Sequence, residues 1–564
     1  MGGGILNIIS SGSQNVILNG NPNKTFWKSS YSKYTNFGKQ NFRVDYDGSK
    51  TLRLSEESTF TFAIPRYADL LMDCYLSIKM PNIWSPIYPP QEIIDENNNV
   101  IYSNWIPYEF EWIENLGSQM IKTISISCGN QKLQEFSGQY LLSAVQRDFT
   151  TTKKQLFDEM TGNVPEMNDP KSHASRNNAY PNAYYTENPA GAEPSIREKI
   201  LYIPLNAWFN LKSQMAFPLI STQYTQLTIT ITMRPIYELF RIRNVTDYTN
   251  GYPFVAPNNN QSYMQFHRFL QTPPDLALDT TSYIDKRSLW NTDIHLNCTY
   301  AFLSDDERQI FAEKEQKYLI KQIHEHNFYN ITGTNKVHLD SLGLVSNWMF
   351  YLQRNDVNLR NEWSNYTNWL YTNPHRMGFM GNGLSPAPID GNYTIPSTNI
   401  TIGAGINSDD SKTQLMITDD YNIRNEKEIL LTMGILLDGQ YRENILPSGL
   451  YNYIEKYVRT EGFAPPGLYC YNFGLNTSAF NLQPSGAINM TAFNSVELEF
   501  VAIVPPVNPM AQTLTICNPE TNEIIGINKP TWQIFDYNFN LTVFEERYNI
   551  INIVSGEAGL MYAT

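Results

Sequence analysis

The stretch Ser304-Asp-Asp-Glu-Arg-Gln-Ile-Phe-Ala312 lies near the middle of the 564-residue chain and has the pattern of a short helix. Ser304 followed by Glu307 matches a capping box, and acidic residues fill the first turn, where the helix dipole favours negative charge. Ile310 and Phe311 supply an apolar face. We therefore predict a connecting helix over residues 304–316.

Both sides of this helix alternate apolar and polar residues, the period of half-buried strands. Leu227–Met233 is the clearest case, and Phe60–Ile64, Ile124–Cys128 and Val496–Phe500 repeat it. Helical patterns are few, at Gln134–Asp148, Lys153–Met160 and Tyr451–Val458. A chain of this length needs more than one core. A helix between two β-rich halves of similar size predicts two tandem β-sandwiches.

The composition narrows the class of protein. Hydrophobic residues make up 41% and aromatic residues 13%, so disorder is excluded as the overall state. The net charge of −14 argues against a nucleic-acid-coating protein and against binding to anionic lipid. Five scattered cysteines, with no close pair, predict buried, reduced thiols in a cytosol-like compartment. We see no signal peptide, and the longest apolar run, Ile429–Leu437, is too short to span a bilayer.

Long polar loops interrupt the strand pattern at Pro81–Gly117, Gly162–Ser195, Tyr237–Arg287 and Asn355–Thr413. Loops beyond roughly 15 residues are uncommon in compact domains and are usually functional. Strands that project long loops from their ends are typical of sandwiches and jelly rolls.

Seven segments carry a recognisable pattern in a fixed order. They are Gly20–Pro22 with Thr25–Lys28 and Tyr34–Phe37; Tyr202–Leu205 with Trp208-Phe209; Phe217–Tyr224; Phe302–Arg308 with Phe311-Ala312 and Tyr318–Gln322; Asp438–Arg442; Gln483–Gly486; and Tyr548–Leu560. Together they resemble motifs of the major capsid proteins of large icosahedral double-stranded DNA viruses, the chlorovirus, iridovirus and mimivirus relatives. Ser221-Thr222 and Thr225 depart from the usual pattern, and Cys517–Trp532 has no clear counterpart.

The resemblance implies an all-β double jelly roll, in which two tandem eight-stranded antiparallel sandwiches with long loop insertions are joined by the short helix. The first jelly roll would span 24–303, the connecting helix 304–316 and the second jelly roll 317–556. Residues 1–23 would form an arm at the capsid base, and 557–564 a C-terminal tail.

The function implied is structural. The chain would form homotrimeric capsomers of pseudo-hexagonal outline that tile an icosahedral virion shell. Its partners would be neighbouring capsomers, minor capsid or cement proteins and penton proteins, close to an internal viral membrane and without direct nucleic-acid contact. It would be made in the host cytoplasm, in a viral factory, and reside in the virion capsid.

Two other functions stay open on the residues alone. One is a carbohydrate-binding or glycoside-cleaving β-sandwich protein, because such domains share this architecture. The other is a scaffold or minor capsid protein with the same fold.

We find no motif for catalysis or cofactor binding, so we expect neither an enzyme nor a cofactor. His324 and His326 share one face of a strand, but no third metal ligand is evident nearby. Asp419, Asp420 and Asn422 lack the spacing of a calcium loop. Gly403 and Gly405 are interpreted as loop residues. Accordingly, no metal site is expected.

Sequons are frequent in this Asn- and Thr-rich chain, and most arise from composition. If the protein carries glycans, the long second-half loop is the expected place, at Asn365, Asn392 and Asn399. The aromatic pairs Trp27 with Tyr34 and Trp348 with Phe350 are expected to pack in the core or in a trimer interface.

Overall fold

The protein is described from a computed structural model. The structure describes residues 4, 12–48, 51–85, 108–176, 179–181, 193–247, 252–272, 287–371, 426–478, 480–505, 534 and 536–562, and the backbone of short strands at 87–88, 92–94, 100–102, 106–107, 392–395, 400–403, 514–517 and 524–528.

The first half folds into two facing antiparallel sheets. Sheet A1 has the order β1 (Phe37–Val44), β18 (Ile294–Leu303), β4 (Leu70–Met80), β12 (Lys199–Pro204), with the short β13 (Phe217–Pro218) also on β4. Sheet B1 has the order β11 (Gln131–Ser137), β10 (Ile121–Cys128), β14 (Leu227–Met233), β3 (Ser58–Ala63).

The second half repeats this architecture. Sheet A2 has the order β19 (Gln316–Ile331), β31 (Phe539–Val554), β21 (Leu344–Arg354), β26 (Leu468–Asn472), with β27 (Ile488–Asn489) on β21 and β32 (Glu557–Leu560) on β31. Sheet B2 has the order β20 (Thr334–His338), β28 (Val496–Ala502), β24 (Leu430–Leu437), β25 (Gln440–Pro447).

The two halves share one strand order. The eight principal strands of each half can be numbered 1 to 8 in chain order. Sheets A1 and A2 then both have the strand order 1-8-3-6. Sheets B1 and B2 both have the strand order 2-7-4-5. The fold is therefore a double jelly roll, as the sequence predicted.

The cores follow the predicted alternation. In β14 every apolar residue is buried and the threonines between them are half-buried. β28 repeats this pattern in the second sandwich. Burying such side chains contributes roughly 1.5–3 kcal/mol each. Four cysteines, Cys74, Cys128, Cys298 and Cys470, are buried and free, which agrees with the predicted buried thiols.

The connecting helix α8 covers Asp305–Glu313 and is shorter than the predicted 304–316. Ser304 is its N-cap residue, but its side chain makes no capping hydrogen bond, so the predicted capping box does not form. No residue of α8 is buried, and Ile310 is 48% exposed. Phe311 is half-buried, so the expected apolar face is only partly covered within one chain.

The other helices cover the sandwiches or link strands. Within the predicted helix at 134–148, residues up to Ser137 belong instead to strand β11, and the helix α4 covers Gly138–Asp148; α5 covers Thr151–Thr161. In the second sandwich a π-turn, η9 (Leu450–Ile454), continues into α9 (Glu455–Arg459). Shorter helices are α2 (Val16–Asn19), α3 (Leu116–Gln119), α6 (Pro165–Asn168) and α7 (Trp208–Leu211). Among the described residues, no helix is long and apolar enough to cross a membrane.

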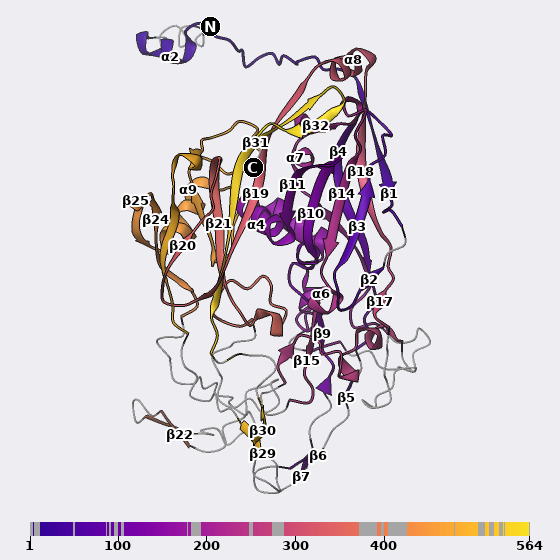
Figure 1. Cartoon of the computed structure of the whole chain (residues 1–564), viewed down its shortest axis with the longest axis vertical. Helices are drawn as coiled ribbons and strands as arrows, with labels where there is room; N and C mark the ends of the chain where they lie inside the picture. Colours follow the sequence, from indigo (N-terminus) through magenta and orange to yellow (C-terminus); the bar gives the residue numbers. More distant parts are fainter. Residues whose placement is uncertain are drawn as a thin grey trace.

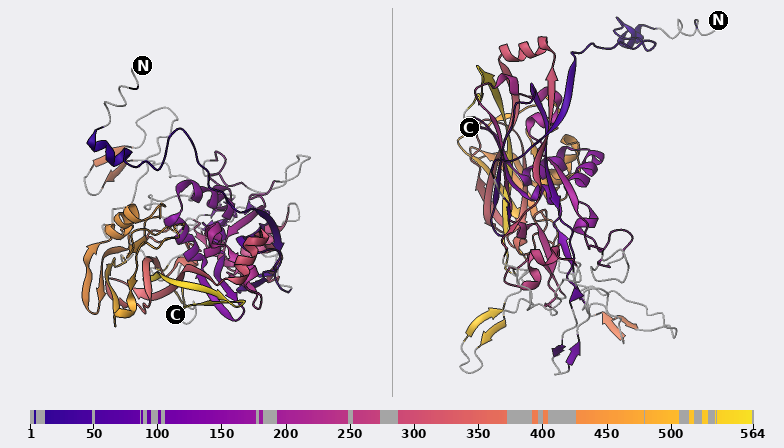
Figure 2. Two further views of the ribbon diagram at one scale, coloured as in Figure 1. Left: turned by 90° about the horizontal axis from the view of Figure 1, so that it is seen from above. Right: turned by 90° about the vertical axis from the view of Figure 1, so that its right-hand side faces the viewer.

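The sandwiches stand side by side with their strands along the long axis (Figure 1). The N-terminal segment containing α2 extends away from the body at the end that carries α8 (Figures 1 and 2). The opposite end carries four small two-stranded sheets: β5 (Ile87–Tyr88) with β8 (Ile106–Pro107), β6 (Glu92–Ile94) with β7 (Val100–Tyr102), β22 (Asn392–Ile395) with β23 (Ile400–Gly403), and β29 (Leu514–Cys517) with β30 (Ile524–Asn528).

Two further small sheets lie in the first half: β16 (Phe254–Val255), β15 (Phe240–Arg243) and β9 (Phe110–Trp112) form one, and β17 (Leu289–Trp290) and β2 (Leu52–Arg53) form the other. Short 3-10 turns occur at Ser13–Asn15, Ser213–Met215, Leu219–Ser221, Ile236–Glu238, Ser262–Met264, Phe266–Leu270, Val357–Leu359 and Met490–Ala492.

Candidate functional site: the junction between the sandwiches

The two sandwiches meet through α4, the helix that follows β11. Its N-cap is Ser137, whose hydroxyl accepts a hydrogen bond from the backbone N–H of Tyr140 at 3.2 Å and so stabilises the helix start. Most side chains of α4 are buried because the helix lies between its own sandwich and sheet A2 (Figure 1). Its buried polar side chains therefore need partners across the junction.

Arg147 provides the main link. It is 1% exposed, and its Nε and Nη2 donate to the two carboxylate oxygens of Asp148 at 2.8 and 2.6 Å. Nη2 also donates to Oε1 of Glu546 at 2.7 Å, and Nη1 donates to Oδ1 of Asn347 at 2.7 Å. The planar, forked guanidinium suits several acceptors at once, which a lysine could not match.

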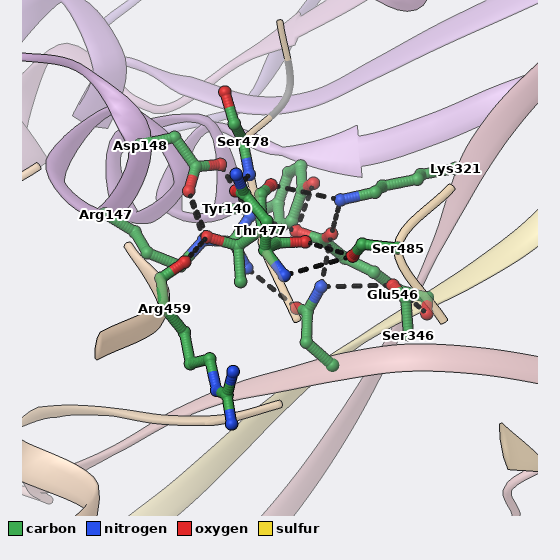
Figure 3. A network of polar contacts seen from close by, with 12 residues as sticks. Tyr140, Arg147, Asp148, Lys321, Ser346, Arg459, Thr477, Ser478, Ser485 and Glu546 are labelled. Carbon is green, nitrogen blue, oxygen red and sulfur yellow. Dashed lines mark hydrogen bonds and ion pairs between the residues drawn. The ribbon is translucent and has the colours of Figure 1, made fainter. Parts of the chain in front are cut away.

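Glu546 on β31 is the acceptor at the centre of the junction (Figure 3). Besides Arg147, it accepts from the Tyr140 hydroxyl at 3.0 Å, Lys321 Nζ at 2.8 Å and Asn347 Nδ2 at 2.9 Å. Burial of the carboxylate opposes ionisation, but the charges of Arg147 and Lys321 outweigh it and hold the pKa of Glu546 well below its ordinary value.

The charges in this network balance. Arg147 and Lys321 are the two cations, and Asp148 and Glu546 are the two anions; Asp148 also accepts from the Thr477 hydroxyl at 2.8 Å. Buried ions are tolerated only when paired and hydrogen-bonded, and removing one member leaves an uncompensated charge. All four charges are therefore paired only when the two sandwiches have this relative placement.

Apolar contacts surround these charges. The ring of Tyr140 meets Phe544 edge-on at 5.6 Å, beside a buried cluster that includes Met349 and Tyr351 of sheet A2. A cavity of about 110 Å³ lies next to the network, between α4 and the loop that carries Gln483–Ser485. The junction is thus a packed interface whose central charges are all hydrogen-bonded to one another or to neighbouring side chains.

His324 and His326, the pair considered for metal binding, lie on β19 and are opposite Glu545 and Val543 of β31. The Nε2 atom of each is buried and has no hydrogen-bond partner among the described residues. Burial, with the charges of Arg547 and His326, lowers the pKa of His324 to about 4. No group of three or more His, Cys, Asp or Glu side chains in the described part of the chain could hold a metal ion.

The glycan candidates fall in different surroundings. Asn365 is 3% exposed; its Nδ2 donates to the Trp369 carbonyl at 2.7 Å and to Glu362 at 3.1 Å, and its Oδ1 accepts twice from Thr367. The folded chain therefore presents no accessible amide at Asn365. Asn392 begins β22, and Asn399 lies outside the described residues, as do Asp419, Asp420, Asn422 and Gly405.

The aromatic candidates separate into two groups. Trp348 and Phe350 are 0% and 1% exposed in the core of the second sandwich, as expected for core packing. Trp27 and Tyr34 are 96% and 86% exposed, so a core position for them is wrong, and a position in a trimer interface stays a prediction.

Sequence reasoning missed the junction residues. Arg147 and Glu546 are 399 positions apart, so no local pattern joins them. One signal was available: Glu545, Glu546 and Arg547 are consecutive charges inside a strand that is otherwise buried. Charges are almost never fully buried unless they are paired, so such a triplet indicates partners elsewhere in the fold.

Family models match both sandwiches. The model described as "Major capsid protein N-terminus" matches residues 25–290, and the one described as "Large eukaryotic DNA virus major capsid protein" matches residues 307–559. The major capsid protein of Phaeocystis pouchetii virus is 22% identical over 603 residues, and that of Paramecium bursaria Chlorella virus 1 is 23% identical over 567 residues, each covering 100% of both chains.

The match to a third relative is partial. The major capsid protein of Chrysochromulina ericina virus is 27% identical over 339 residues, which cover 57% of this chain and 52% of that protein, so the chain matches about half of that relative's length.

Solved structures share the fold. The PBCV-1 VP54 structure fitted into a reconstruction of the virophage Sputnik has a TM-score of 0.60 at 17% identity, covering 96% of this chain and 100% of that one. The Faustovirus major capsid protein has a TM-score of 0.57 at 14% identity, covering 98% and 99%. With both sandwiches matched by family models and the double jelly roll shared throughout, the chain belongs to the major capsid proteins of large eukaryotic DNA viruses.

Proposed function

We propose that this chain is the building block of an icosahedral virion shell, in which homotrimers of pseudo-hexagonal outline act as capsomers. The observation that supports the proposal is that the chain contains two sandwiches of the same strand order, which the buried ion-pair network joins. Three copies would place six similar sandwiches in a ring, and a ring of six equivalent units tiles a surface. The role is geometric, and we propose no catalytic step.

The two ends of the molecule support an orientation in the shell. Exposed aromatic residues, among them Phe26, Trp27, Tyr31 and Tyr34, line the N-terminal segment. Such an apolar stretch is unusual on a free surface and marks an interaction site. We propose that residues 1–23 and the adjoining aromatic segment lie at the capsid base, near minor capsid proteins and an internal membrane, with 24–303 and 317–556 as the upright jelly rolls and 557–564 as a basal tail.

The opposite end would face outward. The four small two-stranded sheets lie there, on the long loops between the principal strands (Figure 1). Any glycan would belong at this end, and we propose Asn392 and Asn399 as its sites, since Asn365 is buried. Neighbouring capsomers, cement and penton proteins would contact the flanks, and assembly would take place in a viral factory of the host cytoplasm.

The native mass of the purified full-length protein, measured by light scattering across a dilution series, tests the proposal. A stable species of three times the 64.9 kDa chain mass is expected. A monomer that binds oligosaccharides would instead favour a carbohydrate-binding sandwich. Intact-mass spectrometry of virion protein tests the glycans, because a bare chain mass would exclude them.

A further inference from the structure

The two surfaces that form the contact between α4 and sheet A2 each have an equivalent elsewhere in the chain, and these two equivalents do not contact each other. Within one chain, the helix that follows the fifth strand of the first sandwich packs on the outward face of sheet A2. The second sandwich has its own helix after its fifth strand, η9–α9, and the first sandwich has its own equivalent sheet, A1. Neither surface is covered by the other within the chain, because they lie on opposite flanks (Figure 1).

The register of the strands identifies the equivalent position on sheet A1. In sheet A2 the pairing of β21 with β31 shifts after Val345, and the next pair is Asn347 with Glu546, the acceptors for Arg147. In sheet A1 the pairing of β4 with β18 shifts in the same way after Leu71, and the next pair is Asp73 with Thr299. Asp73 therefore occupies on sheet A1 the place of Asn347 on sheet A2.

Asp73 is a half-buried carboxylate that lacks a cationic partner within the described part of the chain. Its carboxylate is half-buried on the outward face of the sheet, and no described residue forms a hydrogen bond or ion pair with it. Burial raises its pKa, and the positive charge of Lys39 opposes this shift. Apolar surface lies on the same sheet face, where Ile200 and Tyr202 of β12 are 48% and 42% exposed.

The η9–α9 helix presents a complementary surface. Tyr453, Ile454, Tyr457 and Val458 are 59%, 55%, 91% and 56% exposed and follow the spacing of one helical face. Arg459 ends the helix, and its guanidinium forms no hydrogen bond or ion pair with a described residue. Figure 3 shows this side chain pointing away from the junction network.

We propose that the η9–α9 face of one copy docks onto the outward face of sheet A1 of a second copy, around Asp73, with Arg459 as the cation that pairs with this carboxylate. This inference rests on the proposed function and names the contact that builds the trimer. It repeats between copies the contact that α4 makes with sheet A2 inside one copy. Because the two surfaces differ, the interface is heterologous, and such contacts generate closed rings when the rotation closes.

Charge reversal tests the pairing. Arg459→Glu and Asp73→Arg each place like charges at the contact and should weaken self-association at least about tenfold by light scattering. The double variant restores opposite charges in swapped positions and should recover most of the wild-type association. Tyr457→Asp should also weaken association, whereas Tyr329→Asp, which changes a tyrosine 68% exposed outside both surfaces, should not.

The outcomes separate the two proposals. A wild-type protein that is monomeric at every concentration overturns the capsomer proposal and this contact together. A wild-type trimer that is unchanged by all three single variants overturns this contact alone. Circular dichroism and urea unfolding of each variant establish that the chain is folded, and recovery by the double variant cannot arise from misfolding.

Discussion

Replacing Arg147 with methionine removes the cation that links α4 to sheet A2 and tests whether the junction network stabilises the folded chain. The side chain donates four hydrogen bonds, two to Asp148 and one each to Glu546 and Asn347. Without it, Asp148 loses its ion-pair partner, and Glu546 keeps Lys321. Breaking a buried ion pair by removing one partner costs about 3–5 kcal/mol, so the free energy of unfolding should fall by that amount.

The matched control is Arg43→Met. Arg43 also bridges two carboxylates, with its Nε 2.8 Å from Asp45 and its Nη2 2.7 Å from Asp293, but its side chain is 48% exposed. Solvent screens this pair, and the expected loss is within about 1 kcal/mol. Urea unfolding at one fixed chain concentration, followed by tryptophan fluorescence and circular dichroism, measures both variants, because any oligomer makes stability depend on concentration.

A second variant separates charge from packing. Arg147→Met with Asp148→Asn removes one cation and one anion, so Lys321 and Glu546 remain as a balanced pair. This double variant should be more stable than Arg147→Met alone if the uncompensated charge is the cause. Equal losses of stability for Arg147→Met and Arg43→Met would contradict this prediction, because they would show that burial of the network adds nothing to the free energy of unfolding.

Three further predictions concern other parts of the chain. The pKa of His324 is lowered from 6.5 to about 4, so between these values the unfolded chain takes up a proton that the folded chain does not, and the free energy of unfolding should fall as the pH falls. His324→Gln should flatten this part of the pH profile of the urea midpoint. Gly138→Ala places a Cβ against backbone carbonyl oxygens and should cost about 1–3 kcal/mol in urea unfolding, whereas Gly38→Ala meets only the Cβ of Phe302 at 4.0 Å, an ordinary contact, and should cost less. Asn365→Ala should lower the unfolding midpoint by removing a buried, fully bonded amide, and peptide mapping of wild-type virion protein should find Asn365 unmodified.

The architecture explains how one chain could supply two equivalent units of a ring. The same strand order and the same shift of register occur in both sandwiches, yet the polar centre differs between the two sheets. Sheet A2 has its partner in the same chain, and sheet A1 keeps Asp73 unpaired. The outward face of sheet A1 is therefore where we propose that a second copy binds.

Much of the fold was predictable from local patterns. The alternation in Leu227–Met233 and Val496–Phe500 depends only on neighbouring residues, because a strand turns successive side chains to opposite faces. The helix near residue 305 and the two β-rich halves followed from the same kind of reasoning. The order of motifs along the chain indicated the family without any knowledge of contacts.

Several strands, the two halves and the family could be predicted from the amino-acid sequence, since each depends on residues close together in the chain. Which charges meet could not be predicted in this way, because Arg147 and Glu546 are brought together by the packing of two separate sandwiches. The packing of the chain also leaves Asn365 buried and Trp27 exposed, the reverse of what these residue types usually show. The burial of a single side chain depends on the packing of the whole chain, so short-range sequence periodicity cannot predict it.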